Sequence, residues 1–215
     1  MKFSIIIPTW NNLKYLKICL NSIKKNSKYQ HDLNVHVSEG TDGTIEYLTN
    51  NAIKFNHSVE NLGLCKGANS AASLAETDYI VYTHDDMYLL PDWDFFLSEE
   101  INKIKTNLYY FSGTMMGPKG CGFLEFNCGT IAEEFDEAKL LNNYHNLNYF
   151  DHQGTHWAPH LIHKTVWDKI GGFSKEFDPG YASDTDLNMK LWKVGVRIFK
   201  GINNFKVYHF GSISM

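Results

Sequence analysis

Two adjacent carboxylates, Asp85 and Asp86, follow the apolar run Tyr79–Thr83 directly and are preceded by His84. Neighbouring carboxylates repel each other unless a positive charge lies beside them. Their hard oxygen atoms suit Mg²⁺ or Mn²⁺, which can bridge the oxygens of a diphosphate. An Asp-Asp pair is also common in turns, and Pro91 lies nearby. The pair alone indicates either a cation site or a turn.

Two further polar motifs follow expected strands. Glu39 lies in Val-Ser-Glu-Gly-Thr-Asp-Gly-Thr, where a carboxylate could accept a hydrogen bond from a nucleobase and glycines permit close approach of the backbone. A helix entry capped by Thr41 or Asp42 is the structural alternative. Lys66 lies in Asn-Leu-Gly-Leu-Cys-Lys-Gly-Ala-Asn and could meet a phosphate or the base. No Gly-Lys-Ser/Thr sequence is present here, which argues against a P-loop nucleotidase.

Two motifs with potential chemistry lie late in the chain. Asp184 and Asp186 begin an expected helix, where an anion is electrostatically favoured. Such a carboxylate serves as a general base if its pKa suits proton transfer from a hydroxyl, and otherwise it is an N-cap. His209 follows the last expected strand, where a lone histidine is usually structural. His160 and His163 could bind zinc, but no third ligand has a convincing spacing.

The elements that must position these side chains alternate between strand and helix in the first half. The run Phe3–Ile7 is typical of a strand buried on both faces. Further strands are expected at Leu33–Val37, Ile53–Phe55 and Tyr79–Thr83, and helices at 13–23 (capped by Asn11 or Asn12), Thr44–Asn51 and Leu64–Leu74. This alternation predicts an α/β sheet whose ligands gather at the carboxyl ends of the strands. Each polar motif of this half follows such an end.

The second half is less regular, because five glycines break the stretch from Gly113 to Gly129. Strands are expected at Tyr109–Gly113, Val196–Phe199 and Phe205–Tyr208, and helices at Glu133–Asn143, Lys164–Ile170 and Asp184–Val194. No repeat or low-complexity linker is evident, which predicts one domain over residues 1–215.

Composition limits the possible partners. The net charge of −4 argues against a nucleic-acid partner, and no apolar run approaches the ~20 residues of a membrane span. The four cysteines form no Cys-x-x-Cys pair, and the simplest inference is a reduced, cytoplasmic protein. Five lysines between Lys14 and Lys28 indicate either a solvated helix face or peripheral contact with a membrane.

Taken in order, these motifs resemble the family 2 glycosyltransferases of the GT-A fold. The resemblance runs from Phe3 to Ser212 and rests on Ile-Ile-Pro-Thr-Trp-Asn, the Glu39 and Lys66 motifs, His-Asp-Asp-Met, Gly-Gly-Phe, Ser-Asp-Thr-Asp-Leu and His-Phe-Gly-Ser. It implies a Rossmann-like α/β domain with a mixed, mostly parallel central sheet flanked by helices. Residues 1–110 would form the nucleotide-binding half, and residues 111–215 the acceptor-binding and catalytic half.

The resemblance also implies roles for individual residues on the donor side. Asp85 would contact the ribose, Glu39 the base (usually uracil), and Asp86 with His209 would hold Mn²⁺ or Mg²⁺. The nucleotide pocket would also include Pro8, Thr9, Trp10, Asn61 and Lys66. Ser38 and His84 depart from the family pattern, in which aspartates are common at both places, and the role of His84 is unassigned.

On the acceptor side, the resemblance implies that Asp184 is the general base, with Trp157 and Asp186 near the acceptor. Ser183 replaces the glutamate that commonly precedes this aspartate. The implied reaction is inverting transfer from a UDP-sugar to a hydroxyl of a glycan, lipid or protein. A catalytically weak nucleotide- or carbohydrate-binding module is one alternative. A sugar-nucleotide pyrophosphorylase is another, although its Gly-rich basic loop is replaced here by Pro8–Asn12.

Overall fold

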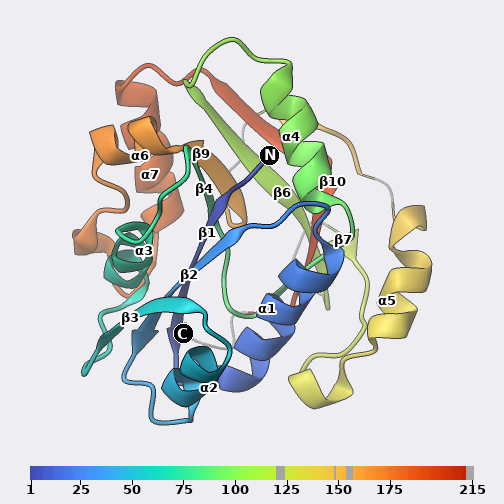
Figure 1. Ribbon diagram of the computed structural model, residues 1–215. Helices are drawn as coiled ribbons and strands as arrows, with labels where there is room; N and C mark the ends of the chain where they lie inside the picture. Colours follow the sequence, from blue (N-terminus) through green and yellow to red (C-terminus); the bar gives the residue numbers. More distant parts are fainter. Residues whose placement is uncertain (120–123, 148, 154–156, 212–215) are drawn as a thin grey trace.

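The computed structural model describes residues 1–119, 124–147, 149–153 and 157–211 (Figure 1). Its strands build one mixed sheet with the order β3-β2-β1-β4-β9-β6-β10-β5. The strands are β1 Ser4–Trp10, β2 Asp32–Ser38, β3 Lys54–Ser58, β4 Tyr79–Tyr82, β5 Met87–Leu89, β6 Tyr109–Gly117, β7 Leu124–Glu125, β8 His152–Gln153, β9 His160–His163 and β10 Ile198–His209. Ser212, at which the family resemblance ends, and Cys121, one of the four cysteines, lie outside the described residues.

Most neighbouring strands in this sheet are parallel. β3, β2, β1 and β4 pair in parallel, as do β6 and β10. β9 runs antiparallel to both β4 and β6, and β5 runs antiparallel to β10. The predicted mixed, mostly parallel sheet is therefore confirmed. Since β1, β2 and β4 end at one edge, the polar residues after them are brought together there.

Helices cover both faces of the sheet. In Figure 1, α3, α6 and α7 lie to the left of the sheet, and α1, α4 and α5 lie to the right. The helices are α1 Leu13–Asn26, α2 Thr44–Asn50, α3 Leu64–Ala72, α4 Trp93–Asn102, α5 Glu137–Asn143, α6 Lys164–Ile170 and α7 Ser183–Lys193, with 3₁₀ turns at η1 Ala132–Glu134, η2 Tyr144–Asn146 and η3 Lys175–Phe177. The apolar sides of α1, α2, α3, α4, α6 and α7 share one continuous buried core with the inner strands β1, β4 and β9, and Leu140 of α5 lies in a second, smaller cluster.

Several local predictions need correction. Asn12 occupies the N-cap position of α1, but its side chain makes no capping hydrogen bond. Instead, Asp42 Oδ2 accepts a hydrogen bond from the Leu13 backbone N–H at 2.7 Å. The two late strands are one strand, β10, with an irregular register between Ile202 and Lys206. The expected helix at 133–143 is split into η1 and α5.

His160 and His163 do not form a zinc site. The His160 ring is buried in β9 between Tyr82 and Tyr110, with ring centroids 4.9 and 5.0 Å away. Burial lowers the pKa of His160 to about 3. His163 instead caps α6 by accepting a hydrogen bond from the Thr165 backbone N–H. Both histidines are therefore structural.

The lysines of α1 are in part neutralised by partners. Lys14 forms an ion pair with Glu133, and Lys25 pairs with Glu137 at 2.9 Å. These contacts tie α1 to η1 and α5, and they favour the solvated-face interpretation over a membrane surface. Within the described ranges, no helix combines the length and apolar character needed to cross a bilayer.

A buried His–Asp pair fixes the entry to β2. Asp94 accepts hydrogen bonds from His31 Nε2 at 3.0 Å and from the backbone N–H groups of Lys28 and Tyr29. Both side chains are almost fully buried. Burial alone would raise the pKa of Asp94, but these hydrogen bonds bring it below its usual value.

We expect Asp94→Ala to lower the free energy of unfolding by about 3–5 kcal/mol, because several buried donors lose their acceptor together. Urea denaturation at neutral pH measures this loss. Glu99→Ala, at an exposed position of the same helix, is the matched control and should change stability by less than about 0.5 kcal/mol. Equal effects of the two substitutions would contradict a structural role for Asp94.

Candidate active site

A cleft of about 640 Å³ opens at the carboxyl ends of β1, β2 and β4. Residues from both halves of the chain line it. The lining includes the predicted residues Pro8, Thr9, Trp10, Asn61, Asp85, Asp86, Trp157, Asp184 and His209, together with Ser38, Gly63, Leu64, His84, Met87, Met115, Ala158, 179–183 and Gly211. The cleft therefore lies at the carboxyl ends of the strands, where ligands of the predicted sheet are expected to gather.

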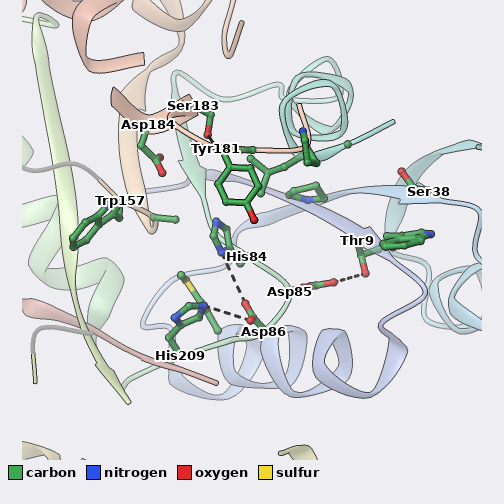
Figure 2. A pocket seen from close by; sticks show the side chains of 18 of the residues that line it. Thr9, Ser38, His84, Asp85, Asp86, Trp157, Tyr181, Ser183, Asp184 and His209 are labelled. Atoms are coloured by element: carbon green, nitrogen blue, oxygen red, sulfur yellow. Dashed lines mark hydrogen bonds and ion pairs between the residues drawn. The ribbon is translucent and has the colours of Figure 1, made fainter. Parts of the chain in front are cut away.

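At the floor of the cleft, His84, Asp86 and His209 form a cluster (Figure 2). His209 Nε2 lies 3.4 Å from Asp86 Oδ2, and His84 Nδ1 lies 3.9 Å from Asp86 Oδ1. Candidate ligand atoms from the three residues all lie within 4.8 Å of one another. Two imidazoles and one carboxylate form a donor set that suits a divalent metal ion.

Electrostatics leave His84 in the form that binds metals. Burial lowers the pKa of His84 to about 4, and His209 contributes in the same direction, while the Asp86 carboxylate opposes the shift. The imidazole is therefore neutral at pH 7, and neutral imidazole is the ligand form. His84 had no assigned role in the sequence analysis, and the structure brings it to the cluster.

Asp85 points away from this cluster. Its Oδ2 accepts a hydrogen bond from Thr9 Oγ1 at 2.6 Å, which joins the end of β1 to the loop after β4 (Figure 2). Trp10 is 39% exposed at the rim of the cleft, on the same side as Thr9. The two neighbouring aspartates thus face different partners.

Three predicted site residues do not line the cleft. Glu39 has its carboxylate turned to Asn11, whose Nδ2 donates to Glu39 Oε2 at 2.8 Å. The Lys66 ammonium lies 3.7 Å from Asp178 Oδ2. Asp186 follows Asp184 by two positions on α7, which points it to another side of the helix. Ser38, which precedes Glu39, does line the cleft.

Asp184 points into the cleft from the wall opposite the cluster of His84, Asp86 and His209 (Figure 2). It lies in the first turn of α7. Its Oδ1 is buried and has no hydrogen-bond partner within the described part of the chain. Burial raises the pKa of Asp184 to about 7. A carboxylate with this pKa can accept a proton near neutral pH.

Two aromatic side chains flank Asp184. Tyr181 is 74% exposed and Trp157 is 49% exposed, and both line the cleft. Large apolar groups at such exposure, beside a buried carboxylate, are typical of a surface that stacks on a ligand. Trp157 was predicted here, whereas Tyr181 was missed, although it stands only three residues before Asp184.

The loop that carries Tyr181 is fastened to the start of α3. Asp178 Oδ1 accepts a hydrogen bond from the Cys65 backbone N–H at 2.7 Å, and the Pro179 carbonyl accepts one from Leu64. A side chain at Gly63, whose φ is +79°, would collide with the Asp178 carboxylate. The glycine therefore permits a contact between the two walls of the cleft. The contact could not be predicted from the sequence, because Asp178 and Cys65 lie far apart in the chain.

The sheet order, the helices on both faces and the cleft at the strand ends define the GT-A class of glycosyltransferase fold. TarS 1–349 of Staphylococcus aureus matches with a TM-score of 0.70 at 18% identity over 97% of this chain and 60% of that one. GalNAc-T7 with UDP, GalNAc and Mn²⁺ matches at 0.69 and 12% identity, over 97% of this chain and 43% of that one. The predicted fold class is confirmed.

The sequence profile described as Glycosyl transferase family 2 matches residues 4–160. The chain belongs to this family, which confirms the predicted class of enzyme. Poly(ribitol-phosphate) beta-N-acetylglucosaminyltransferase TarS of Staphylococcus aureus is 32% identical over 96 residues, which are 41% of this chain and 17% of TarS. Abequosyltransferase RfbV of Salmonella typhimurium is 34% identical over 95 residues, 40% of this chain and 28% of RfbV. The matches thus span less than a third of either relative.

Proposed function

We propose that this chain transfers a sugar from a UDP-sugar to an acceptor hydroxyl and inverts the anomeric configuration. The observation that carries the proposal is one cleft with two facing chemical groups. A carboxylate poised to accept a proton lies on one wall, and a candidate metal cluster lies on the floor. The choice of UDP is supported by the structural similarity to TarS 1–349 in complex with UDP-GlcNAc, which matches this chain with a TM-score of 0.68 at 18% identity.

The donor's nucleoside would lie along the β1 side of the cleft. Thr9 and Trp10 supply a hydroxyl and an exposed ring there, and Asp85 supplies a carboxylate for the ribose. Pro8 and Asn61 line the same region. Glu39 and Lys66 would need to turn from Asn11 and Asp178 to reach the base or the diphosphate. Those two roles remain proposals from the family resemblance.

Asp86 and His209 would hold a divalent cation, Mn²⁺ or Mg²⁺, and His84 lies beside them in the same cluster. The fit rests on their donor chemistry and on the proximity of their ligand atoms. When bound, such a cation neutralises charge on a leaving diphosphate. The backbone carbonyl of the buried Asp86 accepts a hydrogen bond from the Phe210 backbone N–H, which holds the loop after β4 beside the end of β10 and His209.

Asp184 would take the proton from the acceptor hydroxyl as that oxygen attacks the anomeric carbon. The new carbon–oxygen bond forms on the face opposite the departing nucleoside diphosphate, whose bond to carbon breaks with both electrons. The proton ends on Asp184. One displacement of this kind inverts the anomeric centre, and its rate depends on Asp184 being ionised beforehand.

The acceptor would enter between Trp157 and Tyr181, beside Asp184. Their rings suit stacking on the apolar face of a sugar, which favours a glycan over a lipid or a protein hydroxyl. Asp186 would contribute at the edge of this subsite. A cytoplasmic location remains a proposal from the sequence, whereas peripheral contact with a membrane is disfavoured, because Lys14 and Lys25 are paired with Glu133 and Glu137.

The proposal is tested by thermal melting with a panel of nucleotides, with and without Mn²⁺. UDP should raise the melting temperature more than the other nucleoside diphosphates do, because it is the nucleotide of the proposed donor. A ligand that binds only the native state stabilises it by about 2.7 kcal/mol at 100 times its Kd. UDP release from UDP-sugars is then measured with glycan acceptors. Failure of every nucleotide to stabilise the protein would contradict the proposal. Binding without turnover across a broad acceptor panel would instead favour the binding module.

A further inference from the structure

His84 is the cleft residue that the family resemblance leaves without a role. It immediately precedes the Asp85–Asp86 pair at the end of β4, where aspartate is common in relatives. The structure places its Nδ1 3.9 Å from Asp86 Oδ1, while His209 Nε2 lies 3.4 Å from Asp86 Oδ2. The two imidazoles therefore approach different oxygen atoms of one carboxylate.

These distances suit ligands of a shared ion. A close N–H···O hydrogen bond would bring the two atoms to about 2.7–3.2 Å. Ligand atoms bound at roughly 2.0–2.2 Å from one ion stand about 3.0–3.5 Å apart in tetrahedral or octahedral geometry. The His209–Asp86 separation falls in that range, and the His84–Asp86 separation lies slightly beyond it. A small side-chain movement would complete the set.

His84 is also held in place for this role. Its ring packs edge-on against the buried Tyr82 ring, with centroids 5.4 Å apart, and lies 5.9 Å from the His209 ring. The side chain is 27% exposed, so it is accessible from the cleft without being free in solvent. Packing that fixes a rotamer in this way pre-organises a ligand.

We propose that His84 is a third protein ligand for the cation and that it makes the site selective for Mn²⁺ and later first-row divalent ions over Mg²⁺. The inference rests on the proposed function for the role of the cation, and it names which cation the site takes. Mg²⁺ prefers an octahedral shell of oxygen atoms, whereas imidazole nitrogen suits transition ions. Two nitrogens among three protein ligands therefore disfavour Mg²⁺.

The test is a titration of the protein with Mn²⁺, with and without UDP, in which electron paramagnetic resonance measures the concentration of free Mn²⁺. The wild-type protein should retain Mn²⁺ against a ~100-fold excess of Mg²⁺. His84→Ala should weaken Mn²⁺ binding by more than about 100-fold, because loss of an outer-shell partner alone costs about 10- to 100-fold. His84→Asp, which restores an oxygen ligand, should still bind Mn²⁺ but should lose it to the same excess of Mg²⁺.

The exposed His145→Ala is the matched control and should bind Mn²⁺ as the wild type does. Circular dichroism melts confirm that each variant folds, and His84→Asp decides the question should His84→Ala fail to fold. Mn²⁺ affinity of His84→Ala within twofold of wild type, or equal displacement by Mg²⁺ from wild type and His84→Asp, would overturn the inference. If one of these outcomes is found and the wild type still transfers sugar, the role of His84 is refuted and the proposed function stands. If the wild type binds no Mn²⁺ even with UDP, the inference falls together with the cation of the proposed function.

Discussion

Replacing Asp184 with asparagine is expected to slow sugar transfer by about 10²- to 10⁴-fold, the usual contribution of a general base. The amide keeps the shape of the side chain but cannot accept the proton of an acceptor hydroxyl. The affinity for UDP should stay within about twofold, since Asp184 lies on the wall opposite the metal cluster. Single-turnover transfer and UDP calorimetry measure the two quantities separately. Transfer at the wild-type rate would refute the assignment of the base.

The rate should also depend on pH through Asp184. Burial raises its pKa to about 7, so half of the protein holds the base in its protonated, inactive form at that pH. Transfer should fall about tenfold for each pH unit below this value and reach a plateau above it. An acid limb centred near the ordinary carboxyl pKa of about 4 would contradict the burial argument.

Asp184→Asn should also stabilise the protein at alkaline pH. Between pH ~4 and ~7 the folded state keeps a proton on Asp184 that the unfolded chain releases, so the unfolding free energy falls as pH rises through this window. Above pH ~7 the folded protein carries a buried, ionised carboxylate. Asp184→Asn removes this cost and should gain about 1–3 kcal/mol at pH 8, or roughly 2–10 °C in Tm.

The stability gain should vanish below about pH 3, where Asp184 is protonated in both the folded and the unfolded state. Asp168→Asn, at an exposed position of α6, is the matched control and should leave both transfer and stability unchanged. A misfolded variant would lose activity and stability together. Loss of activity with a gain of stability therefore separates a catalytic role from a structural one.

The parallel half of the fold could be predicted because its signals are local. β1 and β4 are nearly continuous apolar runs, and the helices between the strands have regular apolar spacing. β9 was missed, because it has four residues, begins and ends with histidine, and pairs with β4 and β6, which lie far away in sequence. β5 has only three residues. The helix α4 could have been found from the spacing of Trp93, Leu97 and Ile101, which are all buried.

The candidate site also has a part that could be predicted from the sequence and a part that could not. Residues at strand ends, such as Thr9, Asp85 and His209, reach the cleft because the sheet brings its carboxyl edge together. Glu39, which was predicted at the nucleotide, does not line the cleft, because its left-handed backbone (φ 61°) and its hydrogen bond with Asn11 turn its carboxylate to Asn11. Tyr181 and the Asp178 contact lie in a loop, where no periodic pattern reports on side-chain direction.

Replacing Asp86 with alanine is expected to abolish the increase in UDP affinity that Mn²⁺ produces. Asp86 would supply the oxygen ligand of the proposed cation, between the two imidazoles of the cluster. Even an outer-shell partner of a metal ligand is worth about 10- to 100-fold in affinity, so loss of a ligand itself should exceed 100-fold. Calorimetric titration of UDP with Mn²⁺, and with a chelator instead, measures this increment directly.

Asp85→Asn is the variant that sharpens this prediction. Asp85 accepts a hydrogen bond from Thr9 and faces away from the cluster. As the proposed ribose contact, it should affect UDP binding to a similar degree with Mn²⁺ and with chelator. Asp86→Ala should affect binding only with Mn²⁺, because its contribution passes through the ion. A Mn²⁺ dependence of UDP binding that is unchanged in Asp86→Ala but lost in Asp85→Asn would exchange the two roles, and Asp85 would then be the metal ligand.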